Sequence, residues 1–206
     1  MVEYRGYEWR VLPGVFAPYP AFSSKKGLSG KNIDMYLGRR VLDLGCGCGV
    51  RGIMAGLCGA KEVIATDICE VACRNTLLNI QRHRTFRVKV VCTDMFSGLR
   101  GSFDTIVAYL PSRDAAVSKP WERAIYDPGL RLNRQLFDEA WQYLVPGGTL
   151  HASLLDQGAI PEFLDQIASR GYELTSHKVC PHETGDWHPL SLRWPVVVTP
   201  KEGNHG

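Results

Sequence analysis

The fold is decided by one stretch of the chain, Val41-Leu42-Asp43-Leu44-Gly45-Cys46-Gly47-Cys48-Gly49-Val50. Its first four residues predict a buried strand, and three glycines follow at alternate positions. Glycine lets the backbone turn tightly and approach a ligand where a Cβ atom would collide. The residues after Gly49 predict a helix to about Cys58, and the first N–H groups of a helix have no partner within it. The stretch therefore predicts a strand, a ligand-binding turn and a helix in succession.

The spacing of these glycines distinguishes the turn from a dinucleotide-binding loop. Such a loop has the pattern G-x-G-x-x-G and places a pyrophosphate at the helix N-terminus. Here the pattern is G-x-G-x-G, and Asp43 stands two residues before the first glycine. A carboxylate at that place opposes a pyrophosphate, whereas it attracts a ligand that carries an ammonium or a sulfonium group.

Two further acids follow the next two predicted strands. Asp67 ends the second strand, where a carboxylate can accept hydrogen bonds from both hydroxyls of a ribose. Asp94 follows the third strand, where a carboxylate can accept a hydrogen bond from an adenine amino group. Because Asp43, Asp67 and Asp94 all stand at the carboxyl ends of neighbouring strands, we expect them to surround one ligand.

From residue 39 onward, short β-branched runs alternate with helical stretches. This alternation predicts an α/β domain with a mainly parallel sheet, because parallel strands need long crossover connections. The last two strands have no helix between them, so we expect them to form an antiparallel hairpin at one edge. The predicted strands are 39–44, 61–67, 86–92, 103–109, 149–155, 172–180 and 191–198, and the predicted helices are 50–58, 70–83, 130–144 and 160–169. The predicted parts are an N-terminal extension or lid at 1–38, the domain at 39–198 and a tail at 199–206.

Composition narrows the class of protein. The chain has 206 residues, 45% of them hydrophobic and 22% charged, with a net charge of +3, which fits one globular domain. That charge is too mild to indicate a nucleic-acid partner, and the sequence contains no apolar stretch of membrane-spanning length and no signal peptide. We therefore expect a cytoplasmic protein without a nucleic-acid or membrane partner. The seven cysteines and the C-terminal histidines match no metal-ligand spacing, so we expect reduced, mostly buried thiols and no metal.

Several motifs together resemble the class I S-adenosylmethionine-dependent methyltransferases. The matching stretches are 43–49, 65–67, 93–94, 103–107 and 144–148. The resemblance implies a Rossmann-like seven-stranded sheet of order 3-2-1-4-5-7-6 with the last strand antiparallel, and S-adenosyl-L-methionine as the cofactor. It also implies that Asp67 binds the ribose and Asp94 the adenine, with Ile68 and Met95 as apolar neighbours of the adenine ring. The other cofactor-binding residues that we predict are Asp43, Gly45, Cys46, Gly47, Gly49 and Tyr109.

Within this superfamily, the chain is similar over more residues to the enzymes that methylate a glutamine amide in peptide release factors. The shared pattern includes residues 14–18 and 65–68. In that group the fourth strand ends in Asn-Pro-Pro-Tyr, whereas this chain has Tyr109-Leu110-Pro111-Ser112. A phenol cannot supply both hydrogen bonds that an amide side chain gives to a planar nitrogen. The replacement argues against glutamine, or a base amino group, as the acceptor.

The candidate residues on the acceptor side come from three segments. Tyr109 is predicted to hydrogen-bond an amine or to stack on the sulfonium, with the alternative that it is a wall of the pocket. The predicted catalytic residues are Tyr109, Glu122 and Tyr126, and the predicted substrate or lid residues are Phe16, Tyr19, Phe22, Pro111 and Ser112. The aromatic residues of the lid have packing on the sheet edge as their alternative role. Asp127 is a further candidate for binding an amine or guiding a proton, but we expect it to start a helix, because Pro128 follows it. His151 is expected in the core.

The expected activity is methyl transfer to a nitrogen or oxygen of a small molecule, by a monomer or homodimer. The N-terminal extension is shorter than the protein-recognition domain expected in release-factor methyltransferases, which favours a small acceptor. One alternative is attack of the methionine amine on its own activated chain, which yields a cyclic amino acid and methylthioadenosine. Another alternative is a non-catalytic protein that binds the cofactor.

Overall fold

The computed structural model describes residues 1–17, 30–156, 159–181 and 186–196. The strands are β1 (Val2–Tyr4), β2 (Tyr7–Trp9), β3 (Arg40–Leu44), β4 (Glu62–Asp67), β5 (Val88–Cys92), β6 (Phe103–Ala108), β7 (Leu144–Leu155), β8 (Glu173–His177) and β9 (Trp187–Arg193). The α-helices are α1 (Gly30–Tyr36), α2 (Val50–Leu57), α3 (Glu70–His83), α4 (Arg131–Glu139) and α5 (Ile160–Ser169). Three short 3₁₀ turns are η1 (Pro120–Ala124), η2 (Pro128–Leu130) and η3 (Ala140–Tyr143).

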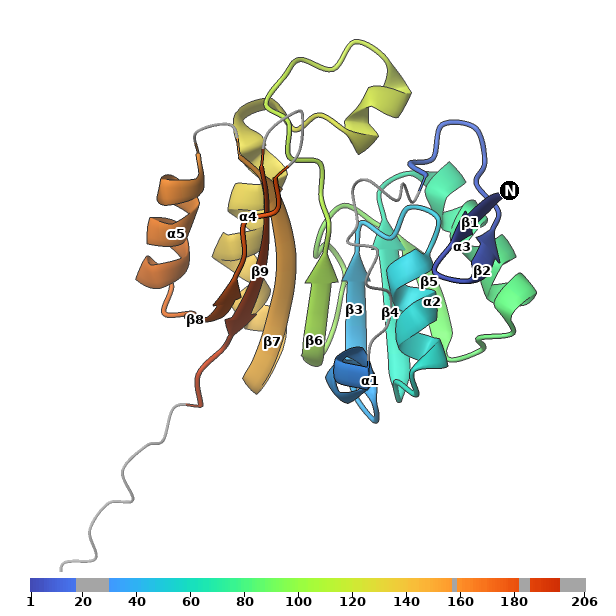
Figure 1. Ribbon diagram of the computed structural model, residues 1–206, viewed down its shortest axis with the longest axis horizontal. Helices are drawn as coiled ribbons and strands as arrows, with labels where there is room; N and C mark the ends of the chain where they lie inside the picture. Colours follow the sequence, from blue (N-terminus) through green and yellow to red (C-terminus); the bar gives the residue numbers. More distant parts are fainter. Residues whose placement is uncertain (18–29, 157–158, 182–185, 197–206) are drawn as a thin grey trace, which may run out of the picture.

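Seven of the strands form one sheet in the order β5-β4-β3-β6-β7-β9-β8 (Figure 1). The strands from β5 to β7 in this order are parallel, and β9 runs antiparallel to both β7 and β8. This is the order 3-2-1-4-5-7-6 with an antiparallel last strand, so the predicted fold is confirmed. The order reverses between β3 and β6, and ligands of open α/β sheets bind beyond the carboxyl ends of the strands at such a point.

The sheet is buried on both faces by two hydrophobic clusters. Val41 and Leu42 are neighbours on β3, and each is fully buried in a different cluster. Leu42 belongs to the cluster of α4 and α5, which includes Phe137. Val41 belongs to the cluster of α2 and the N-terminal residues, which includes Ile53 and Trp9. Each burial of this kind contributes about 1.5–3 kcal/mol, and helices on both faces explain the near-continuous apolar strands.

The position of the last strand differs from the prediction. The sequence predicts a strand at 191–198, whereas β9 occupies Trp187–Arg193. The difference arises at Pro189, which has no N–H and is therefore typical of a loop rather than of a strand paired on both sides. In the structure Pro189 pairs with Ser153 of β7, and its carbonyl accepts a hydrogen bond from the amide of Lys178 (3.2 Å). Pro189 lies inside the sheet, contrary to its propensity.

The start of the chain forms a hairpin that the sequence analysis did not predict. The two strands β1 and β2 are joined by Arg5 and Gly6, which both have positive φ (56° and 76°). Trp9 is fully buried, and its ring centroid lies 4.4 Å from that of His83 at the end of α3. The hairpin is therefore packed against α3 and contributes to the same core as the sheet.

Some predicted features fall outside the described residues: the lid residues Tyr19 and Phe22, and the tail at 199–206. Among the residues that the structure does describe, no helix combines the length and the apolar character needed to cross a membrane.

Candidate active site

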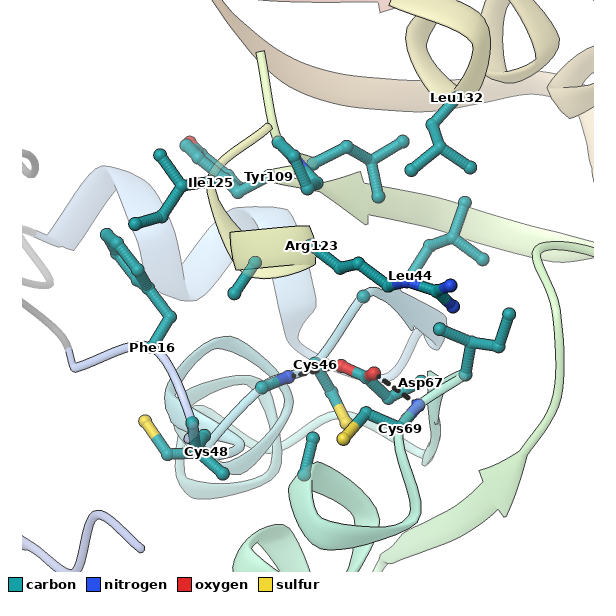
Figure 2. Close-up of a pocket in the computed structure, with 18 of the residues that line it drawn as sticks. Phe16, Leu44, Cys46, Cys48, Asp67, Cys69, Tyr109, Arg123, Ile125 and Leu132 are labelled. Atoms are coloured by element: carbon teal, nitrogen blue, oxygen red, sulfur yellow. Dashed lines mark hydrogen bonds between the residues drawn. The ribbon is translucent and has the colours of Figure 1, made fainter. Parts of the chain in front are cut away.

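A cavity of about 760 Å³ opens beyond the carboxyl ends of β3, β4 and β6 (Figure 2). This volume is within the range of sites that hold cofactors or drug-sized ligands, about 300–1,000 Å³. One half of the cavity is formed by residues 44–48, 50, 66–69, 72 and 93–95, and we call it the cofactor half; the predicted cofactor-binding residue Gly49 is not part of its lining. The other half is formed by residues 109–113, 120, 121 and 123–125 with Phe16 and Arg51, and we call it the acceptor half.

The glycine loop forms the floor of the cofactor half. The amides of Gly45 and Cys46 both donate to the carbonyl oxygen of Thr66, at 2.9 and 2.8 Å, which fixes the loop to the end of β4. Gly49 has a φ of 86°, and a Cβ atom there would lie 2.7 Å from the Cγ2 atom of Thr76 on α3. Only glycine allows this conformation together with this close packing. The predicted turn is thus held by backbone bonds and by the approach of α3.

Asp67 links the glycine loop to the turn between β4 and α3. One carboxylate oxygen accepts from the amide of Gly47 and the other from the amide of Cys69, both at 2.9 Å (Figure 2). Burial raises the pKa of this carboxyl above its usual value. Each oxygen of a carboxylate can accept more than one hydrogen bond, so both remain able to receive a ribose hydroxyl. Asp67 lines the cavity where the sequence placed the ribose.

The residues expected around the adenine also line the cofactor half: Ile68, Asp94 and Met95. Ile68 is 58% exposed, which is unusual for a large aliphatic side chain beside a pocket. Met95 is buried and has a positive φ of 47°, a strained conformation for a non-glycine residue. An exposed apolar side chain and a carboxylate beyond β5 provide the surface and the acceptor that an adenine needs.

Asp43 lies beneath the cavity and is not among the residues that line it. Its Oδ2 atom accepts a hydrogen bond of 2.7 Å from the amide of Gly52, and a Cβ atom at Gly52 would lie 2.9 Å from the same oxygen. Burial raises the pKa of Asp43 to about 7. The carboxyl group therefore joins the end of β3 to the first turn of α2, which positions the glycine loop from below.

Three polar side chains of α3 form hydrogen bonds that the sequence analysis missed; two of them hold the glycine loop from the side, and Asn75 holds only the N-terminal segment. Thr76 donates to the carbonyl of Gly47 (3.0 Å), and Asn79 donates to the carbonyl of Cys48 (2.8 Å). Asn79 also exchanges two hydrogen bonds with the backbone of Arg10. Asn75 binds the backbone of Arg10 and Leu12 in the same way. The spacing of these residues could have indicated their role, because it places them on one face of the helix. Polar residues that are fully buried there need hydrogen-bond partners.

In the acceptor half, the predicted residues Phe16, Tyr109, Pro111 and Ser112 all line the cavity. The guanidinium of Arg51 lies over the ring of Tyr109, with 3.7 Å from Cζ to the ring centroid. One face of the ring is therefore occupied by an arginine of this chain, which limits the predicted stacking on a sulfonium to the other face.

The predicted catalytic residues Glu122 and Tyr126 lie outside the lining of the cavity. The carboxylate of Glu122 accepts from the amides of Ser118 and Lys119, at 2.7 and 2.9 Å, and so stabilises the start of η1. The same loop instead places Trp121 and Arg123 in the lining. The sequence could not distinguish which face of this short turn points inward, because a 3₁₀ turn of five residues has no apolar period.

Asp127 has the structural role that was expected for it. It precedes Pro128 at the start of η2, and its carboxylate accepts from the amide of Leu132 at 2.9 Å, at the beginning of α4. His151 also has a structural partner, since its Nδ1 atom lies 3.0 Å from the hydroxyl of Ser191. Burial lowers the pKa of His151 to about 4, so this histidine is neutral at pH 7.

The cysteines differ from the expectation of mostly buried thiols. Three of the seven are exposed, and Cys46, Cys48 and Cys69 line the cavity. All seven are free, and none belongs to a group of metal-ligating side chains among the described residues. At the C-terminal edge, His177 and His188 bind each other (2.8 Å) away from this cavity.

The fold and the cofactor half define a class I S-adenosylmethionine-dependent methyltransferase. The chain belongs to the Methyltransferase small domain family, which matches it over residues 9–176. S-adenosylmethionine, the cofactor of this class, fits the residues present, since the carboxylates of Asp67 and Asp94, which the resemblance assigns to its ribose and adenine, both line the cavity. The predicted enzyme class and cofactor are therefore confirmed.

The curated relatives include methyltransferases that are named for a ribosomal protein and methyltransferases that are named for ribosomal RNA. Ribosomal protein L11 methyltransferase of Oceanobacillus iheyensis is 27% identical over 171 residues, which are 82% of this chain and 47% of the relative. Ribosomal RNA small subunit methyltransferase C of Mannheimia succiniciproducens is 31% identical over 156 residues, 75% of this chain and 43% of the relative. The chain spans less than half the length of these relatives. Among solved structures, the ribosomal protein L11 methylase of Lactobacillus delbrueckii subsp. bulgaricus has a TM-score of 0.68 at 21% identity, covering 90% of this chain and 84% of that one.

These relatives overturn the expectation of a small-molecule partner and no nucleic acid. Their names refer to a ribosomal protein and to ribosomal RNA. The expectation rested on a net charge of only +3, and an average over the whole chain conceals where the charges lie. Three arginines, Arg51, Arg113 and Arg123, line this one cavity. A local concentration of this kind, rather than net charge, is what an anionic partner encounters.

Proposed function

We propose that this chain is the catalytic domain of an RNA methyltransferase, which transfers a methyl group to a ring nitrogen or an oxygen of an RNA nucleotide. The observation that carries the proposal is the composition of the acceptor half. Arg51, Arg113 and Arg123 line the cavity on or next to this half, whereas the carboxylates of the lining, Asp67 and Asp94, belong to the cofactor half.

The charge of the cavity distinguishes between the two acceptors that the names of the relatives suggest, a protein and an RNA. The amine acceptors of a protein, a lysine side chain or the N-terminus, are protonated in water, and a protonated amine is repelled by arginines in the same cavity. An RNA acceptor brings phosphates, which arginines attract and hold bidentately. The name of the ribosomal RNA methyltransferase relative agrees with this preference.

Exposed aromatic rings around the cavity favour the same acceptor. Phe16 is 43% exposed, Tyr109 39% and Trp121 49%, and all three line the cavity. Stacking of a base on an aromatic side chain contributes about 1–3 kcal/mol. Figure 2 shows Phe16 and Tyr109 on either side of Ile125, so the rings are held by different segments and border one opening. Unpaired bases of single-stranded RNA fit such a surface.

The reaction needs positioning more than acid or base catalysis. S-adenosylmethionine supplies a methyl group already activated on a sulfonium; the carbon–sulfur bond breaks as the lone pair of the acceptor atom forms the new bond, and the acceptor releases its proton. The glycine loop and Asp67 fix one reactant, and Tyr109 with Trp121 orients the other. Holding two reactants in line can provide about 7–11 kcal/mol of the barrier reduction.

The test is transfer of radiolabelled methyl from S-adenosylmethionine to total RNA and to total protein of the source organism, supplied separately. We expect the label to be incorporated into RNA, so that ribonuclease releases it and protease does not. The Asp67→Ala variant should transfer no label. Label in protein alone contradicts the proposal. Methylthioadenosine formed from the cofactor alone supports the cyclisation alternative, and binding without turnover of either substrate supports a non-catalytic protein.

A further inference from the structure

We infer that Arg51 forms an oxyanion-binding site between the glycine loop and Tyr109, which takes a carboxylate or phosphate group of a reactant. Arg51 is in the first turn of α2, two residues after the last glycine of the loop. Its side chain lines the cavity and extends to the end of β6, where it stacks on Tyr109. It therefore lies where the two halves of the cavity meet.

The guanidinium of Arg51 has no anionic partner in the part of the chain that the structure describes. An arginine carries five N–H donors and no acceptor. Among the described residues, five other arginines each form an ion pair with a carboxylate: Arg40, Arg82, Arg134, Arg170 and Arg193. Arg51 is half-buried, yet forms no hydrogen bond or ion pair with any described residue.

The neighbours of Arg51 cannot replace such a partner. Asp43 is the acid that interacts with it electrostatically, but the Oδ2 atom of Asp43 is bound to the amide of Gly52. The other groups that interact with it electrostatically are the phenols of Tyr4, Tyr36 and Tyr109, and the guanidinium lies over the ring face of Tyr109. Donors that are removed from water and left unpaired destabilise the structure, and charged donors do so most. A ligand oxyanion in the cavity relieves this cost.

The stacking on Tyr109 also prepares the guanidinium for such a ligand. A stacked guanidinium is held in one plane, and its N–H groups lie in that plane rather than toward the ring. Its edge matches the two oxygens of a carboxylate or a phosphate. Because the side chain is already fixed, little conformational entropy is lost on binding.

Two reactants bring such a group to the cavity. S-adenosylmethionine carries the carboxylate of its methionine part, and Arg51 follows the loop assigned to that part. An RNA acceptor carries phosphates, and Tyr109 belongs to the acceptor half. Binding of the methionine carboxylate, which we call the carboxylate source, requires only that the cofactor binds. Binding of an RNA phosphate, the phosphate source, rests on the proposed function.

The test uses the full chain with Arg51→Met, which keeps an unbranched apolar stem and removes the charged guanidinium. Calorimetry with adenosylhomocysteine and with its decarboxylated analogue measures the carboxylate source. Filter binding of a 20-nucleotide single-stranded RNA, at saturating adenosylhomocysteine, measures the phosphate source. Loss of a charge-assisted hydrogen-bonded pair weakens binding by roughly 10–100-fold. The matched control is Arg74→Met, an exposed arginine of α3, which we expect to leave all three affinities within twofold.

The outcomes separate the two sources and the two proposals. Weaker binding of adenosylhomocysteine, but not of its decarboxylated analogue, assigns the carboxylate, even if no RNA is methylated. Weaker binding of RNA alone assigns the phosphate. Equal affinities of wild type and Arg51→Met for all ligands overturn the oxyanion site, whether or not the chain methylates RNA. Arg51→Lys, which keeps the charge but not the planar fork, is the second variant should Arg51→Met fail to fold, and we expect intermediate losses for it.

Discussion

The two halves of the cavity are built in different ways. In the cofactor half, Asp67 and the glycine loop are joined by hydrogen bonds to backbone amides, and all the residues involved lie within 44–95. In the acceptor half, Phe16, Arg51, Tyr109 and Trp121 come from four separate segments and meet only through side chains. A loop that is held by backbone bonds requires glycines and acids at fixed positions, and these form a recognisable sequence pattern. Side chains that come from distant segments form no such pattern. The first half therefore recognises a constant ligand, and the second is free to vary with the acceptor.

The largest effect is expected for Asp67→Ala. The substitution removes the acceptor of the Gly47 and Cys69 amides together with the proposed ribose contact. Charge-assisted hydrogen bonds contribute about 1.5–3 kcal/mol each, so we expect about 100-fold weaker binding of adenosylhomocysteine. Calorimetry checks this, with Asp165→Ala on the exposed side of α5 as the control. An unchanged affinity would remove Asp67 from the cofactor half.

Asp43→Asn tests whether the acid beneath the loop is structural. The pKa of Asp43 is about 7 in the folded protein and near 3.8 otherwise, so the folded state binds more protons between these values. The free energy of unfolding then falls as the pH rises towards 7. Asparagine does not titrate, so the variant lacks this slope. Relative to wild type, we expect it to gain about 2–3 kcal/mol between pH 5 and pH 8, at about 1.4 kcal/mol per pKa unit.

Urea denaturation of both proteins at pH 5 and pH 8 measures this difference. His151, whose pKa burial lowers to about 4, gives a slope of opposite sign between that value and its ordinary pKa of about 6.5. This slope is common to both proteins and cancels in the comparison. Parallel pH profiles for wild type and Asp43→Asn would show that Asp43 is ionised throughout and would weaken its assignment as a buried support.

Asn79→Ala and Asn75→Ala form a matched pair that sharpens the comparison. Both side chains are fully buried and bind the backbone of Arg10, so each substitution should lower the free energy of unfolding by about 2 kcal/mol. Only Asn79 also binds the glycine loop, at Cys48. We therefore expect Asn79→Ala alone to weaken cofactor binding, by about fivefold. Equal cofactor affinities in the two variants would contradict a role for α3 in holding the loop.

The smallest effect is expected for Trp121→Ala, which acts on the acceptor half alone. Loss of one stacking surface of about 1 kcal/mol corresponds to roughly fivefold weaker binding of single-stranded RNA. The affinity for adenosylhomocysteine should stay the same. The control is Trp141→Ala, since Trp141 is similarly exposed but stacks on Trp194 away from the cavity. A loss of cofactor affinity in Trp121→Ala would mean that the two halves are not separate.

Much of the fold was predictable from the sequence because each signal was local. The helix at Glu70–His83 and the strand order followed from hydrophobic period, crossover length and family resemblance. The errors arose where tertiary pairing overrode propensity, as at Pro189 inside β9. The hairpin at the start of the chain was also missed, because three-residue strands have too short a pattern to detect.

The sequence by itself determined the α/β class and the cofactor, and it identified Asp67 and Asp94 as acids at strand ends, which line the cavity, because glycines and acids at fixed spacing dictate backbone geometry. Only the tertiary structure decided that Asp43 is a buried support, that Glu122 stabilises a turn, and that Arg51 meets Tyr109. Those outcomes depend on which side chains from distant segments are brought within a few ångströms. The spacing of residues along the chain does not predict such contacts, because they form only when the sheet and its loops come together around the cavity.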